Sequence, residues 1–260
     1  MRRSRRWCGL LLLLLCLPCL AGGAAEEGPL RGAVGDAAAL ATAPVRWGGG
    51  EWSMVGAAVG AVALAATFDH RLAGQWPGKD GLAEFATAYA LVAPVAAIGW
   101  YGGYGGFAND ARAVQTGANV AEAALFALAA TEGVKVAVGR ERPAGELDNH
   151  RRFHPGNFSE PRTSFPSGHT ALAFATAATL QDSELPATAK VGAYGLATLT
   201  AWARMHDERH WLSDVVGGGL IGYTAGRFVA CRHPLPAEHA ARLMPWLAGD
   251  TVGVAWERRF

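Results

Sequence analysis

Apolar residues in this chain come in long runs with helical spacing, and almost no stretch alternates apolar and polar residues as a strand does. Glycine, proline and charged residues separate the runs, as is usual for connections between helices. The pattern predicts an all-α fold, a bundle of six helices within residues 51–231. Its helices are expected at about residues 53–68, 82–100, 114–138, 170–181, 187–205 and 211–230.

The segments between and around these runs are less regular. Residues 26–50 are rich in glycine and alanine and predict a flexible lead. Residues 101–110 combine glycine with aromatic residues and predict a flexible loop, or a lip that faces a substrate. Residues 139–165 carry many charges and predict a connection that lies in water. In the tail, residues 232–260, apolar residues alternate with other residues at 252, 254 and 256, which predicts a strand. We interpret this strand as a short packing segment. The alternative is the closing strand of an outer-membrane barrel.

The first 25 residues have the three-part layout of a secretory signal peptide. Four arginines in residues 2–6 precede an apolar run at 10–20, and small residues follow at 21–25. We expect cleavage near Ala24 or Ala25; an uncleaved anchor and a lipidated cysteine are the alternatives. Cleavage would remove three of the four cysteines and leave Cys231, so no disulfide framework is expected.

Composition gives no general attraction for nucleic acid, because 23 basic and 22 acidic residues nearly cancel. Candidate chemistry is local, and its first part follows the third predicted helix. Lys135 and Arg142 are seven residues apart, so both cations share one face, about 10 Å apart, if the helix persists past Gly139. Alternatively, Lys135 pairs with Glu132 and Arg142 is a solvated loop charge.

The second candidate part is the sequence Pro-Ser-Gly-His at residues 166–169, which precedes an alanine-rich helix. Proline, a small hydroxyl residue and glycine suit a helix start whose free backbone N–H groups bind an anion. His169 would face that anion and could donate a proton to a departing oxygen. The alternative is an ordinary capped helix start with a surface histidine.

The third candidate part joins Arg204, His210 and Asp214 at the junction of the last two predicted helices. The four-residue step puts His210 and Asp214 on one face if that turn is helical. The carboxylate would then hold one imidazole nitrogen and leave the other unprotonated, as a nucleophile that attacks phosphorus requires. A charged connector without chemistry is the alternative.

Together the three parts resemble the signatures of the type 2 phosphatidic acid phosphatase superfamily, which includes bacterial class A acid phosphatases and vanadium haloperoxidases. Lys135 and Arg142-Pro143 match the first signature, and residues 166–169 match the second. Arg204, His210 and Asp214 match the third, except that Ala203 replaces its serine. The resemblance extends over about residues 53–230.

The resemblance implies a metal-independent phosphohydrolase that works through a phosphohistidine. His210 would attack phosphorus, Asp214 would orient it, and His169 would protonate the leaving oxygen and then activate water. The phosphate oxygens would be held by Lys135, Arg142, Ser167, Gly168 and Arg204. The alanine at 203 removes one hydroxyl near the phosphate and leaves the catalytic pair intact. No metal or other cofactor is expected, and His150 and His154 are interpreted as surface residues.

The substrate is expected to be a lipid phosphate or pyrophosphate, with the soluble phosphomonoesters of a non-specific acid phosphatase as the alternative. A vanadate-dependent haloperoxidase and a catalytically silent binding protein are further alternatives. A membrane is the expected partner, and no nucleic acid is.

The sequence is compatible with more than one membrane topology. The first predicted helix is about 24 Å long, shorter than the roughly 30 Å of a hydrocarbon core, and Glu122 and Lys190 put charges into others. If the leader is cleaved and every helix spans, the three candidate parts lie on the cytoplasmic side. A periplasmic site needs an extra crossing, a retained anchor, or helices that dip in without spanning. We favour an exported, periplasmic, membrane-associated domain, at the inner rather than the outer membrane.

Overall fold

A computed structural model describes residues 29–76, 80–144, 150–157, 159–236, 242–248 and 251–257. The predicted leader, residues 1–25, lies outside them. Within them, each of the six predicted helices is confirmed, with ends shifted by a few residues. The α-helices are α2 Pro29–Arg46, α3 Gly49–Ala66, α4 Asp69–Leu72, α5 Gly81–Ala97, α6 Gly105–Phe107, α7 Ala111–Val138, α8 Gly168–Leu180, α9 Ala187–His206 and α10 Leu212–Arg232. A π-helix, η2 Ile98–Tyr104, links α5 to α6, and a 3-10 turn, η4, covers Glu160–Arg162.

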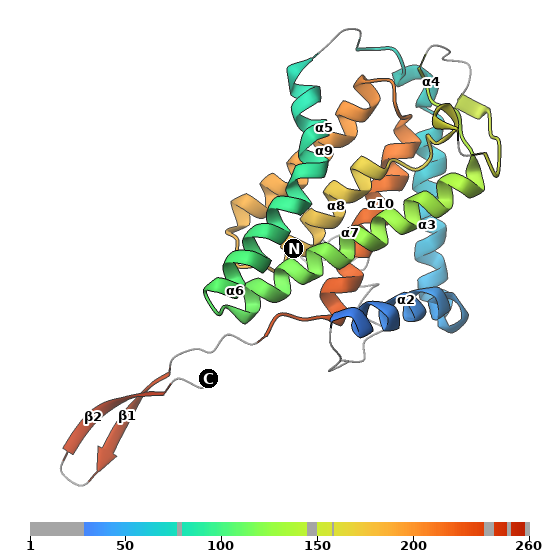
Figure 1. The fold of residues 1–260 in the computed structure, drawn as a ribbon. Coiled ribbons are helices and arrows are strands. Elements are labelled where there is room, and N and C mark those ends of the chain that lie inside the picture. Colours follow the sequence, from blue (N-terminus) through green and yellow to red (C-terminus); the bar gives the residue numbers. More distant parts are fainter. Residues whose placement is uncertain are drawn as a thin grey trace, which may run out of the picture.

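Helix α8 is the centre of the bundle, with α7, α9 and α10 around it (Figure 1). Only His169 and Phe174 among its residues are not buried. A helix that is apolar on all sides has no solvent face, which explains why its sequence lacks a polar stripe. The helical, all-α character predicted for this part of the chain is confirmed.

Glycines on α10 bring its backbone against that of α8. A Cβ atom at Gly222 would lie 2.0 Å from the carbonyl oxygen of Ala171, and one at Gly218 would lie 2.3 Å from the carbonyl oxygen of Ser167. Gly226 continues the same line one turn later, where a Cβ would lie 2.6 Å from the oxygen of Ala175. Close approach along this line fixes the start of α8 beside the start of α10.

Two segments predicted to be flexible are helical. The lead at 26–50 contains α2, because buried Asp36 binds Arg232 and His233 at the end of α10. The predicted loop at 101–110 is mostly the continuation of α5 through η2 and α6. Gly117 on α7 allows this, since a Cβ there would lie 2.6 Å from the amide nitrogen of Gly102. Both differences arise from tertiary contacts that local composition does not reveal.

The connection between α7 and α8 is only partly in water. Gly139 ends α7 in the left-handed conformation, with φ of 60° and its amide bonded to the carbonyl of Lys135. Arg140 then pairs with Phe153 in an isolated β-bridge and is 4% exposed. The expectation that this charge is solvated is wrong, because Arg140 forms buried ion pairs.

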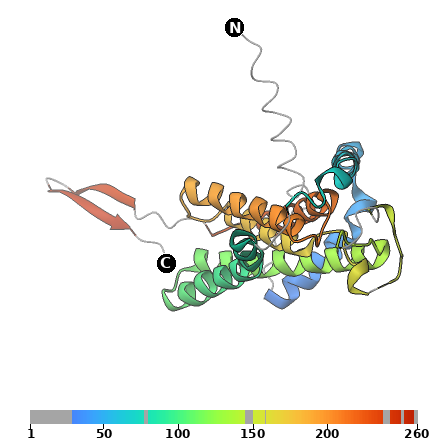
Figure 2. The same cartoon turned by 90° about the horizontal axis from the view of Figure 1, so that it is seen from above.

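The tail forms an antiparallel hairpin of β1 Arg242–Ala248 and β2 Thr251–Glu257, so the strand predicted there is confirmed. Figures 1 and 2 show the hairpin extending away from the helices, and the packing role expected for this segment stays a prediction. Cys231 is disulfide-bonded. The other three cysteines lie outside the described residues, and the expectation of a single thiol in a cleaved chain stays a prediction.

Two helical segments in the described part of the chain are long and apolar enough to cross a membrane, Gly49–Ala66 and Gly81–Phe107. Such helices also occur as buried core helices of soluble proteins. Here α3 has only Ala65 buried, and valine, leucine and aromatic side chains on both segments are exposed. This apolar surface makes membrane association the simplest account of both segments.

Candidate active site

A pocket of about 610 Å³ opens at the end of the bundle where α7 and α9 finish and α8 and α10 begin. Helix N-termini carry free N–H groups and a partial positive charge, so α8 and α10 favour an anion here. The lining combines cations, histidines and rim carboxylates: Lys135, Arg142, Arg204, Arg209, Gly168, His169, His210, Glu84, Glu160 and Asp207.

His210 lies at the base of this pocket with one ring nitrogen fixed by the backbone. Its Nδ1 is 2.6 Å from the carbonyl oxygen of Ser164. A carbonyl can only accept, so Nδ1 carries the proton and Nε2 of the neutral ring is an unprotonated nucleophile. His210 is 3% exposed, and burial lowers its pKa from the usual value, which keeps the ring neutral.

Asp214 acts on His210 less directly than the sequence predicts. Its Oδ2 is 3.7 Å from Nδ1 of His210, whereas it accepts hydrogen bonds from the Ser164 hydroxyl at 2.5 Å and the Trp211 amide at 2.8 Å. Burial alone would raise the pKa of Asp214, but His210, Arg140 and Ser164 outweigh burial and hold that pKa below its ordinary value. The ionised carboxylate thus fixes the segment whose carbonyl holds His210.

His169 follows Gly168 at the start of α8 and faces the same pocket. Burial and, to a smaller extent, charge repulsion from Arg204, His210, Lys135 and Arg142 together lower its pKa to about 4. The free ring is therefore neutral near pH 7. A bound dianion would offset those cations and favour the protonated ring.

Three of the pocket cations are paired with carboxylates. Lys135 Nζ is 2.5 Å from Glu132, Arg204 Nη1 is 3.4 Å from Asp207, and Arg209 Nη1 is 2.8 Å from Glu160. Arg142 Nη2 donates to the Thr163 hydroxyl at 3.2 Å. The buried Nε atoms of Arg142 and Arg204 have no hydrogen-bond partner among the described residues. Unsatisfied guanidinium donors in a pocket are suited to an oxyanion with several acceptor oxygens.

Of the eight predicted site residues, six line the pocket: Lys135, Arg142, Gly168, His169, Arg204 and His210. Ser167 and Asp214 are buried behind it. Ser167 caps α8, its Oγ accepting from the amide of Thr170 at 3.5 Å and from the Thr170 hydroxyl at 3.0 Å. Lys135 and Arg142 were expected to share one face of a helix that continues past Gly139, and this is wrong because α7 ends at Val138. The turn at Gly139 brings both cations to one pocket instead.

Ala203, which replaces the serine of the third signature, is fully buried. It packs with Ala83 and Ala86 of α5 in an apolar cluster.

Several polar residues that build the site were missed at the sequence level. Arg209 lines the pocket, and Arg140 and Ser164 each form a hydrogen bond to Asp214. Arg140 stands two residues before Arg142 and Ser164 three before Ser167, so closeness to the signatures was the available indication. Asp69, which binds Arg140, is far from the signatures in sequence, so no sequence feature indicated its role.

One group of possible metal ligands occurs in the described residues. Asp36, Glu122 and His233 place one ligand atom each within 4.8 Å of one another. None of the three lines the pocket. The pocket itself combines cations and histidines, a lining suited to an anion.

Fold and pocket define a helical protein with a cation-lined anion site around two histidines. Residues 116–235 match the family model described as the PAP2 superfamily. The resemblance seen in the signatures is thereby confirmed.

Among curated proteins, the chain is similar to a lipid A 1-phosphatase of Porphyromonas gingivalis, with 37% identity over 95 residues. The aligned part is 35% of this chain and 18% of that protein, so the match spans about a fifth of the relative's length. No solved structure matches the chain.

Proposed function

We propose that the protein is a phosphatase that removes phosphate from a lipid phosphate or pyrophosphate through a phosphohistidine on His210. The observation that carries the proposal is the fixed ring of His210, whose Nδ1 donates to the Ser164 carbonyl at the base of a pocket with four cations. This arrangement combines an aimed nucleophile with preorganised positive charge. Phosphoryl transfer depends mainly on those two factors.

The reaction begins with attack of His210 Nε2 on phosphorus. The bond from phosphorus to the leaving oxygen breaks, and His169, protonated once the phosphate is bound, gives that oxygen its proton. Lys135, Arg142 and Arg204 hold the equatorial oxygens. The neutral His169 then takes a proton from water, which attacks phosphorus, breaks the bond to His210 and releases phosphate. No step requires a metal ion.

Two observations support a lipid substrate. The relative from P. gingivalis is described as a lipid A 1-phosphatase. Helices α3 and α5, with η2 and α6, expose apolar surface of membrane-spanning length. A protein held at a membrane meets lipid phosphates at high local concentration. We further propose export and an inner-membrane location with the pocket on the periplasmic side, because the chain begins with the layout of a signal peptide.

The experiment that tests this function measures phosphate release in detergent with EDTA present. Substrates are lipid A, a polyprenyl pyrophosphate and a soluble aryl phosphate. Wild type is compared with His210→Ala and, as a control, with His154→Ala, a half-exposed histidine outside the pocket. We expect release from a lipid by wild type and control, and a loss of at least about 10³-fold in His210→Ala.

Mixing with labelled substrate and quenching in alkali adds a direct test of the intermediate. Wild type should carry an acid-labile, alkali-stable phosphate that His210→Ala lacks. Release only from the aryl phosphate would replace the lipid by soluble esters as the substrate class. Equal, background release by wild type and His210→Ala on all three substrates would contradict a phosphatase function.

A further inference from the structure

Three charged side chains form a buried cluster directly behind the pocket. Arg140 Nη1 is 2.6 Å from Asp214 Oδ1, and Arg140 Nη2 is 2.7 Å from Asp69 Oδ2. The side chain of Arg140 is 5% exposed, and those of both aspartates are fully buried. One guanidinium thus joins the short helix α4 to the first turn of α10.

Asp69 also holds that first turn of α10 by a second route. Its Oδ1 accepts from the amide of Ser213 at 2.9 Å, and its Oδ2 accepts from the Ser213 hydroxyl at 2.7 Å. Arg140 Nη1 is in turn 2.6 Å from the Ser213 oxygen. Since Ser213 precedes Asp214, the orientation of Asp214 is set from both its side chain and its backbone.

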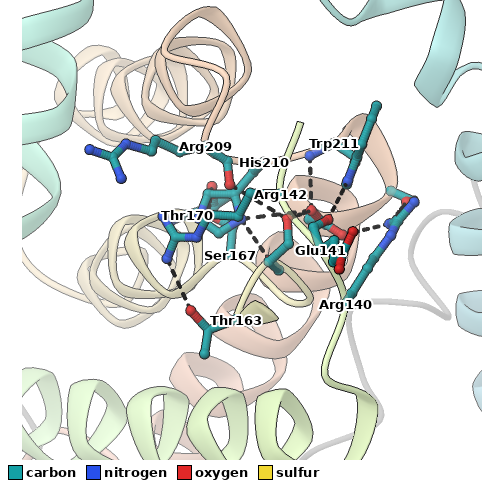
Figure 3. A network of polar contacts seen from close by, with 12 residues as sticks. Arg140, Glu141, Arg142, Thr163, Ser167, Thr170, Arg209, His210 and Trp211 are labelled. Atoms are coloured by element: carbon teal, nitrogen blue, oxygen red, sulfur yellow. Dashed lines mark hydrogen bonds and ion pairs between the residues drawn. The ribbon is translucent and has the colours of Figure 1, made fainter. Parts of the chain in front are cut away.

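The contacts continue from Asp214 to His210. Asp214 accepts the Ser164 hydroxyl at 2.5 Å, and the carbonyl of the same serine accepts from His210 Nδ1 at 2.6 Å. Figure 3 shows Arg140 and Trp211 on one side of this network and Arg209 and Thr163 on the other. A displacement of Arg140 would therefore reach the nucleophile through Asp214 and Ser164 and leave the phosphate-binding cations in place.

We infer that Asp69 is a positioning residue for His210, acting through Arg140 and Ser213 on Asp214. This inference rests on the proposed phosphatase function. Asp69 lies outside residues 116–235, the part that matches the superfamily, so α4 would supply a component of the catalytic centre that the matched part lacks.

The charges of the cluster explain why a second carboxylate is useful. Without Asp69, the guanidinium of Arg140 would fully neutralise Asp214. With it, one net negative charge stays buried beside His210, whose ring becomes positive when it bonds to phosphorus. Buried ion clusters add little net stability compared with apolar packing. Orientation and charge are therefore the contribution we assign to this one.

The test compares full-length wild type, Asp69→Asn and Asp36→Asn in detergent. Asp36 is the matched control: it is 1% exposed and paired with Arg232 and His233, outside the pocket. The measurements are kcat, KM and the inhibition constant of inorganic phosphate. For Asp69→Asn we expect kcat to fall on the order of 10²-fold, the loss typical of a misplaced reacting group. KM and phosphate inhibition should stay within about twofold, as the Lys135, Arg142 and Arg204 contacts do not involve Asp69.

A double-variant comparison tests the route of action. If Asp69 acts through Asp214, then Asp69→Asn combined with Asp214→Asn should lose no more activity than Asp214→Asn alone. If the activity loss of the double variant equals the product of the two single-variant losses, the inference is overturned. An unchanged kcat in Asp69→Asn, a parallel loss of phosphate inhibition, or an equal loss in Asp36→Asn would also overturn it.

If Asp69→Asn does not fold, Ser213→Ala takes its place in the test. That change removes the hydroxyl donor to Asp69, and both aspartates, Asp69 and Asp214, keep their ion pairs with Arg140. We expect kcat to fall several-fold with phosphate inhibition unchanged; an unchanged kcat would overturn the inference. Failure of the proposed function gives a different result. An inactive wild type overturns both, whereas an active wild type with an equally active Asp69 variant overturns this inference alone.

Discussion

His169 and His210 face one pocket, yet their surroundings prepare them for different work. His210 has its Nδ1 proton bound by a backbone carbonyl, which aims the other nitrogen. Burial and then the neighbouring cations lower the pKa of His169 to about 4. A ring in that environment gains its proton when an anion arrives, which is suited to the general-acid role proposed for His169.

The depressed pKa of His169 predicts how stability changes with pH. Its folded-state pKa of about 4 lies below the unfolded value of 6.5, so the unfolded chain binds more protons between them. Stability should fall as pH drops from 7 to 5. In His169→Asn the fall in melting temperature over that range should be smaller than in wild type, with phosphate omitted from the buffer. An identical fall in both proteins would contradict the environment described for His169.

At the scale of elements, the contact between α8 and α10 places the site. Gly218 lets the start of α10 approach Ser167, and the amide of Ser167 donates to the carbonyl of Asp214 at 3.0 Å. The start of α8, which carries His169, is thereby held against the start of α10, which follows His210. Precision in the pocket depends on backbone contact between two helices.

The glycine line on α10 can be tested by adding one methyl group. Gly222→Ala would put a Cβ 2.0 Å from the Ala171 carbonyl, which forces the helices apart. We expect a loss of about 1–3 kcal/mol in unfolding free energy together with a loss of activity. Gly195→Ala on α9 is the control: an added Cβ there would have no atom within 4 Å beyond its own stretch of helix, so this variant should gain up to about 1 kcal/mol. Thermal unfolding would decide, and equal effects at both positions would contradict the close contact.

At the scale of the whole molecule, polar chemistry and apolar surface are separated. The pocket lies at one end of the bundle, whereas α3 and the segment from α5 to α6 expose apolar side chains along their length. This distribution is suited to a domain whose helices enter lipid while its pocket meets phosphate head groups at the interface.

Membrane insertion through α5 predicts a difference between two exposed valines. Val92 on α5 is 60% exposed and Val191 on α9 is 71% exposed. A lysine in the middle of a membrane segment costs about 2.5–3.5 kcal/mol on insertion scales. Val92→Lys should therefore reduce the membrane-bound fraction after cell fractionation, whereas Val191→Lys should not. Equal membrane-bound fractions in wild type and both variants would contradict insertion through α5.

The sequence by itself determined the helical class, six of the helices and six of the residues that line the pocket, because helical periodicity and a spaced set of cations and histidines are local patterns. Only the tertiary structure decided that α2 is helical, that η2 and α6 continue α5, and that Asp69 and Arg140 stand behind His210. Each of these depends on partners far away in sequence, such as Asp36 with Arg232 or Gly117 with Gly102. Burial brings such pairs together, and no local pattern records which distant residue will supply the partner.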